Sequence, residues 1–133
     1  MICLVQSLGL LAASAVLACA SAPALAQSAD EAQLMRDFFT GALEIDVPAG
    51  NWSAKRYFSP DHTYRETGAD GEIKGTWAIE NGKICTTAGK ALADNRAVKY
   101  CNTGLGKHIG ETWQDADPVT DNTVLFKLSP GRA

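Results

Sequence analysis

Charged side chains are absent from the start of this 133-residue chain: residues 1–26 contain no Asp, Glu, Lys or Arg. The segment is apolar and ends in Ala24-Leu25-Ala26, which places small residues at positions −3 and −1 of a cleavage site. This pattern predicts a secretory signal peptide that is removed after Ala26. Because the apolar run is too short to cross roughly 30 Å of hydrocarbon comfortably, we expect no membrane span.

The run Val16-Leu17-Ala18-Cys19 offers an alternative interpretation of the same segment. It partly resembles a bacterial lipoprotein box, in which the cysteine becomes the lipidated N-terminus. Leucine at the second position fits that pattern poorly, and Ala24-Leu25-Ala26 is the better ordinary cleavage site. We therefore favour a periplasmic or secreted protein without a lipid anchor at Cys19.

The mature chain is poor in cysteine, since Cys3 and Cys19 leave with the signal peptide. Cys85 and Cys101 remain in an oxidising compartment, so we expect one disulfide between them. Such a disulfide closes a loop of about 17 residues and stabilises the fold by about 3 kcal/mol. The chain lacks the Cys-x-x-Cys spacing of redox enzymes, and these two cysteines alone supply too few ligands for a metal site.

Clusters of Lys and Arg are also missing. The net charge of −3 falls entirely on residues 27–133, because the signal peptide carries no charge. A mildly acidic domain without a basic patch gives no support for binding to nucleic acid or to an anionic membrane. Residues 27–133 have the length of a single small domain.

Catalytic motifs are lacking as well. The chain has no Gly-x-Ser-x-Gly motif, and its two histidines, His62 and His108, lie far apart in the sequence. We interpret Asp61 as a turn residue that caps its own backbone and His62 as an exposed neighbour. Oxidised cysteines leave no Cys-His pair for nucleophilic catalysis. We therefore predict no catalytic residues, no cofactor and no enzymatic activity.

One acidic loop, residues 115–122, places three carboxylates and an amide close together, and calcium takes oxygen ligands. The loop lacks the glycine and the terminal glutamate of an EF-hand, and Pro118 disturbs the spacing. We prefer to interpret it as a long polar hairpin loop without a metal.

What the chain does contain is a β-hairpin over residues 75–85. Asn81-Gly82 lies between two alternating apolar runs, and both central residues of a type I′ turn need positive φ. A two-residue loop then sets the register of the hairpin. The expected cross-strand pairs are Glu80–Lys83, Ile79–Ile84, Ala78–Cys85 and Trp77–Thr86.

One short amphipathic helix is expected before the strands, over residues of about 29–40. Ser28 and Glu31 have the spacing of a capping box, and Gly41 suits the end of a helix. The apolar stripe of this helix consists of Leu34, Met35, Phe38 and Phe39.

Strand and turn signals alternate over the rest of the chain. They cover residues 55–58, 63–67, 73–79, 83–87, 98–103, 109–114 and 123–128, and residues 42–47 form a further extended segment. The pattern predicts a mainly β fold: an antiparallel meander of six to seven strands over residues of about 52–129, which curls into a small barrel or half-barrel.

A structural aromatic cluster is expected inside this sheet. Its members are Trp52, Tyr64, Trp77 and Trp113. A two-residue turn at Asp70-Gly71 places Tyr64 opposite Trp77. Glycine precedes each tryptophan closely, and glycine lets a bent strand pass beneath a large ring.

Several motifs occur together: Phe58-Ser59-Pro60-Asp61-His62-Thr63-Tyr64, Gly75-Thr76-Trp77, the two mature cysteines and Gly110-Glu111-Thr112-Trp113. This set resembles a family of small exported bacterial proteins of unknown function, over residues of about 50–131. The resemblance implies a curved antiparallel sheet and a periplasmic location, and it implies no reaction. The chain has His62 where the family usually has glycine, so we expect the turn there to differ.

These observations favour a non-catalytic binding or interaction module whose partner is unknown. Small disulfide-linked β scaffolds act through loops and edge strands. An inhibitor that reaches its target with an N-terminal arm, residues 27–30, is one specific form of this hypothesis. The alternative is a lipocalin-like carrier of a small apolar ligand, because Gly50-Asn51-Trp52 resembles the Gly-x-Trp motif of lipocalin-like barrels.

Overall fold

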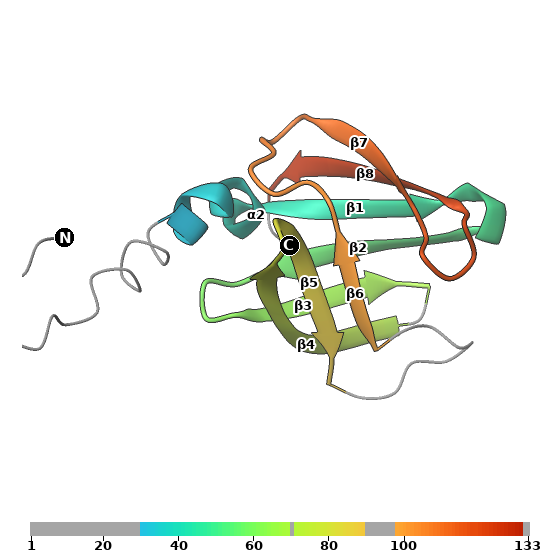
Figure 1. Cartoon of the computed structure of the whole chain (residues 1–133), viewed down its shortest axis with the longest axis horizontal. Helices are drawn as coiled ribbons and strands as arrows, with labels where there is room; N and C mark the ends of the chain where they lie inside the picture. The colour runs from blue at the N-terminus through green and yellow to red at the C-terminus, as the bar shows by residue number, and fades with distance from the viewer. Residues whose placement is uncertain (1–29, 70, 90–97, 132–133) are drawn as a thin grey trace, which may run out of the picture.

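The computed structural model describes residues 30–69, 71–89 and 98–131 (Figure 1). The expected signal peptide 1–26, the lipidation alternative at Cys19, the cap at Ser28 and most of the N-terminal arm lie outside the described residues. Among the described residues, no helix has the length and apolar character needed to cross a membrane.

Two short helices replace the single helix expected over residues 29–40. The first reaches residue 34, and α2 spans Arg36–Thr40. Met35 separates them, with φ −98° and ψ 0°. Both Met35 and Phe38 are buried in the core. Helix α2 packs against β1, β2 and β8 at one end of the strands (Figure 1).

The sheet has eight antiparallel strands, where six to seven were expected. They are β1 (Gly41–Val47), β2 (Trp52–Phe58), β3 (Thr63–Gly68), β4 (Gly71–Glu80), β5 (Lys83–Ala88), β6 (Lys99–Asn102), β7 (Thr112–Ala116) and β8 (Thr123–Pro130), with the 3₁₀ turn η1 (Pro48–Gly50) after β1. Their order in the sheet is β6-β5-β4-β3-β2-β1-β8-β7.

Strand β1 covers the extended segment 42–47, which was not expected to be part of the sheet. It lies between β2 and the C-terminal strand β8. Its apolar side chains Leu43 and Ile45 are buried, while Glu44 and Asp46 lie on the opposite face. This strand joins the N-terminal and C-terminal parts of the chain, so the sheet curls into a nearly closed barrel (Figure 1).

The hairpin between β4 and β5 has the expected register. All four expected pairs are present, from Glu80–Lys83 to Trp77–Thr86. Asn81 and Gly82 have φ values of 51° and 73°, as a type I′ turn requires. The hairpin prediction is therefore confirmed.

The register of the β3–β4 hairpin differs from the expectation, because Tyr64 lies opposite Gly75 and not opposite Trp77. Gly68 pairs with Gly71, so the pairing is shifted by two residues from the one expected. Gly75 provides room for the ring: a Cβ at this position would lie 2.7 Å from Tyr64 Cε1 and 2.1 Å from the carbonyl oxygen of Thr87. Glycine thus lets β4 pass close to both groups.

The two edge strands, β6 and β7, are joined by side chains. Asp115 Oδ2 accepts hydrogen bonds from the backbone N–H and the hydroxyl of Thr103, at 2.9 and 2.8 Å. Trp113 Nε1 donates to the carbonyl oxygen of Thr103 at 3.3 Å, and its ring lies over Gly104. These contacts link the segment that follows β6 to β7, and so bring the two edges of the sheet together.

The expected disulfide between Cys85 and Cys101 is confirmed. The two residues lie directly opposite each other on β5 and β6, with their Cα atoms 3.9 Å apart. The disulfide is compatible with an oxidising, extracytoplasmic compartment.

We predict that Gly75→Ala destabilises the protein by about 3 kcal/mol, because the new methyl group would overlap β5 and the Tyr64 ring. Urea unfolding monitored by tryptophan fluorescence measures the loss. Gly50→Ala is the matched control, since its Cβ would meet its nearest neighbour at 3.7 Å. Equal free energies of unfolding for the two variants would contradict the prediction.

Candidate functional site

A groove on the outer face of the sheet suits a binding partner. It has a volume of about 1010 Å³ and crosses β3, β2, β1, β8 and β7. Its polar lining consists of outward-facing residues of these strands: Glu44, Asp46, Ser53, Lys55, Thr67, Thr112, Gln114 and Lys127. Leu125 lies among them and is 39% exposed.

The strand register explains how charge is arranged in the groove. Glu44 on β1 lies between Lys55 on β2 and Lys127 on β8. It approaches Lys55 Nζ at 4.0 Å and accepts a hydrogen bond from the Ser129 hydroxyl. Two residues along β1, Asp46 lies opposite Leu125.

Three polar side chains of the groove are available to bind a partner. Asp46, Gln114 and Lys127 are exposed, and within the described parts of the chain none of them makes a side-chain hydrogen bond or ion pair. On β7, Gln114 lies opposite Leu125 of β8. An exposed apolar side chain surrounded by available polar groups has the composition of an interface centre with a polar rim.

The barrel interior holds an ion pair that the sequence analysis missed. Arg56 on β2 and Glu66 on β3 lie opposite each other, and their side chains are 5% and 3% exposed. Arg56 donates to Glu66 Oε1 from Nε at 3.1 Å and from Nη2 at 2.6 Å. Its Nη1 is buried and has no partner among the described residues. Arg56 also lies over the Tyr64 ring, 5.3 Å from the centroid.

A signal for this pair was present in the sequence. Arg56 is two residues before Phe58, and Glu66 is two residues after Tyr64, so both occupy inward positions of their strands. Charged residues at two inward positions indicate that they pair inside the barrel, because an isolated buried charge is costly.

Tyr100 lies on β6, close enough to Arg56 for the guanidinium to act on the Tyr100 pKa. Burial is the main cause that raises its pKa to about 12, and the nearby carboxylates of Asp117 and Asp115 raise it further. The Arg56 guanidinium acts in the opposite direction. Tyr100 is therefore a neutral hydroxyl at physiological pH and not a proton acceptor.

The aromatic residues of the expected cluster lie in or beside the core. Tyr64 and Trp77 belong to the buried core, and Trp52 and Trp113 pack against it. Trp77 Nε1 donates to the carbonyl oxygen of Ser59 at 2.8 Å. Trp113 stacks on Phe126 with ring centroids 5.4 Å apart. All four side chains therefore contribute to the packing of the barrel core.

His62 lies at the end of the barrel near the first helix. Its ring stacks on Trp77 at 4.4 Å, and its Nε2 lies 2.9 Å from Glu31 Oε1. Its φ of 68° is the left-handed conformation that glycine adopts easily, so the turn keeps the geometry of a glycine turn. Asp61 Oδ1 accepts hydrogen bonds from the Thr63 backbone and hydroxyl, which also lower the Asp61 pKa.

His108 lies near a different carboxylate. Its Nδ1 is 3.4 Å from Asp37 Oδ2, and the same oxygen accepts a hydrogen bond from the Ile109 backbone at 2.9 Å. The Ile109 hydrogen bond is the main cause of the lowered Asp37 pKa, with Arg36 and His108 acting in the same direction. Asp37 thus holds the segment before β7 against α2.

The acidic loop between β7 and β8 uses its carboxylates to hold the backbone. Asp117 Oδ1 accepts hydrogen bonds from the N–H groups of Val119 and Thr120, at 2.8 and 3.1 Å. Asp115 bonds Thr103 across the two sheet edges. Both carboxylates therefore have a structural role that accounts for their position.

Separate removal of Arg56 and Glu66 should destabilise the protein far more than removal of both. We expect Arg56→Met or Glu66→Gln to reduce the free energy of unfolding by about 3–5 kcal/mol, because each leaves a buried partner without its counterpart. The double variant Arg56→Met/Glu66→Met should recover most of this loss. Urea unfolding of all four proteins completes the double-mutant cycle, and additive losses would contradict the prediction.

Asp37 should stabilise the fold only while it is ionised. Since its pKa in the folded protein is lower than the ordinary 3.8, its contribution is present above that value and is lost as the pH falls through the lower, folded pKa. We expect Asp37→Asn to be less stable than wild type at about pH 6, and the difference to shrink at about pH 2. Thermal unfolding at both pH values measures it. Asp46→Asn is the control, and a pH-independent difference for Asp37→Asn would refute the prediction.

Comparisons with known proteins found no match for this chain. No family model, no curated protein and no solved structure matches the chain. The resemblance to small exported bacterial proteins stays a prediction, as does the similarity to lipocalin-like barrels.

Proposed function

We propose that the protein is an exported, non-catalytic binding module that holds a protein partner in the groove of its outer sheet face. The observation that carries this proposal is the groove itself, with exposed Leu125 beside the available polar groups of Asp46, Gln114 and Lys127. Specific interfaces combine a central apolar contact with a rim of hydrogen-bonding and charged groups.

The chemistry of the partner follows from these side chains. An apolar side chain of the partner would contact Leu125, a basic group would reach Asp46, and an acidic group would reach Lys127. Because Glu44 is already held by Lys55 and Ser129, it contributes less to the charge that a partner meets. The partner surface is thus of mixed charge, which favours a protein over a nucleic acid or a membrane.

The composition of the core supports an outer site over an internal one. Large side chains fill the interior, among them Phe58, Trp77 and Phe126, and the buried Arg56–Glu66 pair of β2 and β3 occupies part of it as well. A carrier of small apolar ligands needs an apolar hollow at this place. A hydrolase inhibitor remains one form of the proposed module, with the groove or the N-terminal arm as its contact.

Photo-crosslinking in the exporting cell tests the proposal. A photoreactive side chain at position 114 should give one dominant protein adduct, and the same group at position 83, outside the groove, should not give it. With the purified partner, Leu125→Asp should weaken binding about thirtyfold, the size of an interface hot spot. Lys83→Glu is the control and should bind as wild type.

Two outcomes would contradict the proposal. One is a set of adducts that is the same from both positions, and the other is an unchanged dissociation constant for Leu125→Asp. An apolar fluorophore that quenches tryptophan emission and binds wild type and Leu125→Asp equally would instead support the internal carrier.

A further inference from the structure

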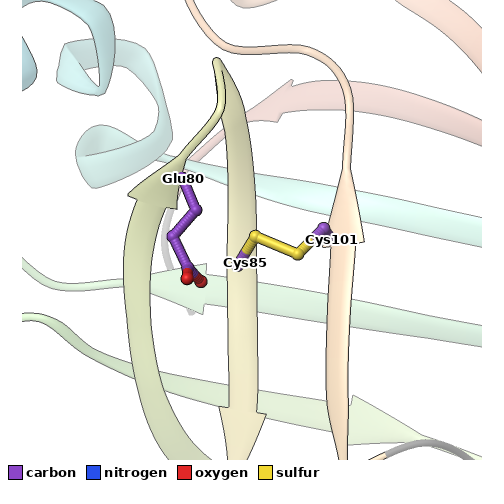
Figure 2. A group of neighbouring side chains, drawn as sticks. All are labelled: Glu80, Cys85 and Cys101. Atoms are coloured by element: carbon purple, nitrogen blue, oxygen red, sulfur yellow. A yellow bond between two sulfur atoms is a disulfide. The ribbon is translucent and has the colours of Figure 1, made fainter.

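A carboxylate lies beside the disulfide on the outer face of the sheet. Glu80 is on β4, two residues beyond Ala78, and Ala78 lies opposite Cys85. Figure 2 shows the Glu80 side chain extending along β5 toward the level of the two sulfur atoms. A carboxylate oxygen of Glu80 and the Sγ atoms of Cys85 and Cys101 all lie within 4.8 Å of one another.

The two sulfur atoms are bonded to each other in this structure, and reduction of the disulfide would turn the three groups into two thiolates and a carboxylate. Two thiolates and a carboxylate are ligands that Zn²⁺ binds, and thiolates disfavour Mg²⁺ and Ca²⁺. Three protein ligands leave the fourth tetrahedral position for a water molecule. Glu80 is exposed, Cys101 is half-buried and Cys85 is buried, so a metal would enter from the side of Glu80 and Cys101. The β4–β5 hairpin thus supplies the third ligand that the spacing of the two cysteines lacks.

We propose that the dithiol form of the protein binds one Zn²⁺ through Cys85 Sγ, Cys101 Sγ and the Glu80 carboxylate. This form exists in every newly made chain before oxidation. Binding releases two thiol protons as two Zn–S bonds form. Because the disulfide uses the same two sulfur atoms, zinc binding and disulfide formation exclude each other. The site lies on β4, β5 and β6 and does not depend on the proposed groove.

Lys99 competes with the metal for Glu80. Its Nζ lies 2.7 Å from Glu80 Oε2 and 2.8 Å from Oε1, and both side chains are about half exposed. An exposed ion pair is weak, so a divalent cation flanked by two thiolates can displace the ammonium group. Removal of Lys99 should therefore tighten zinc binding, whereas an adventitious thiol site would not respond.

Zinc titration of the full mature protein tests the proposal. A phosphine reduces the disulfide, with one phosphine and one water giving a phosphine oxide and two thiols, and a chromogenic chelator reports free Zn²⁺. We expect one equivalent to bind the reduced protein and none to bind the oxidised protein. Glu80→Gln should weaken binding tenfold or more. Lys99→Gln should tighten it about two- to fivefold.

Glu72→Gln is the matched control, because Glu72 is an exposed carboxylate on the same strand, paired with Lys74 at 3.6 Å. It should bind zinc as wild type does. Equal affinity of wild type and Glu80→Gln, or of wild type and Cys85→Ser/Cys101→Ser, would overturn the proposal. Tryptophan emission follows the fold during the titration. If the reduced chain unfolds, zinc must restore the fold of wild type at a concentration at which Glu80→Gln stays unfolded.

Discussion

Two aromatic rings of this small barrel lie against backbone that carries no side chain. Gly75 on β4 provides room for Tyr64, and Gly104 provides it for Trp113. The Tyr64 ring in turn lies beneath the Arg56 guanidinium, and Trp113 packs on Phe126 where β6 and β7 meet. The close approach of backbone and ring therefore sets both the packing of the core and the closure of the sheet.

The outer face of the same sheet is divided between two kinds of chemistry. Strands β3, β2, β1, β8 and β7 carry the groove, whose exposed and charged side chains suit a protein partner. Strands β4, β5 and β6 carry the disulfide, with Glu80 and Lys99 beside it. The alternation of side chains along each strand separates these surfaces from the core, because inward and outward positions follow each other strictly. A buried ion pair can then be held inside while the outer charges stay in water.

Local patterns predicted the parts of the fold that depend on local geometry. The β4–β5 hairpin was predicted with its register, because Asn81-Gly82 allows one tight turn and one pairing. The turn at Asp70-Gly71 was placed one residue too far along, since two glycines flank it and either can take the special conformation. The region before Trp113 was expected to be a strand from residue 109, but Gly110 has φ 97° and β7 begins at Thr112. In each case glycine indicates a bend, but it does not show whether the strand begins before or after that glycine.

The sequence by itself determined the mainly β class, the Cys85–Cys101 pairing and the register of the β4–β5 hairpin, since these follow from alternation and turn signals, from the count of cysteines and from the Asn-Gly turn. Only the tertiary structure decided that β1 lies between β2 and β8, that Arg56 pairs with Glu66, and that Glu80 reaches the two sulfur atoms. The reason is distance along the chain: β1 and β8 are separated by most of the domain, and a strand pattern does not record which distant strand completes its hydrogen bonds. The groove depends on that neighbour and so appears only in the folded protein.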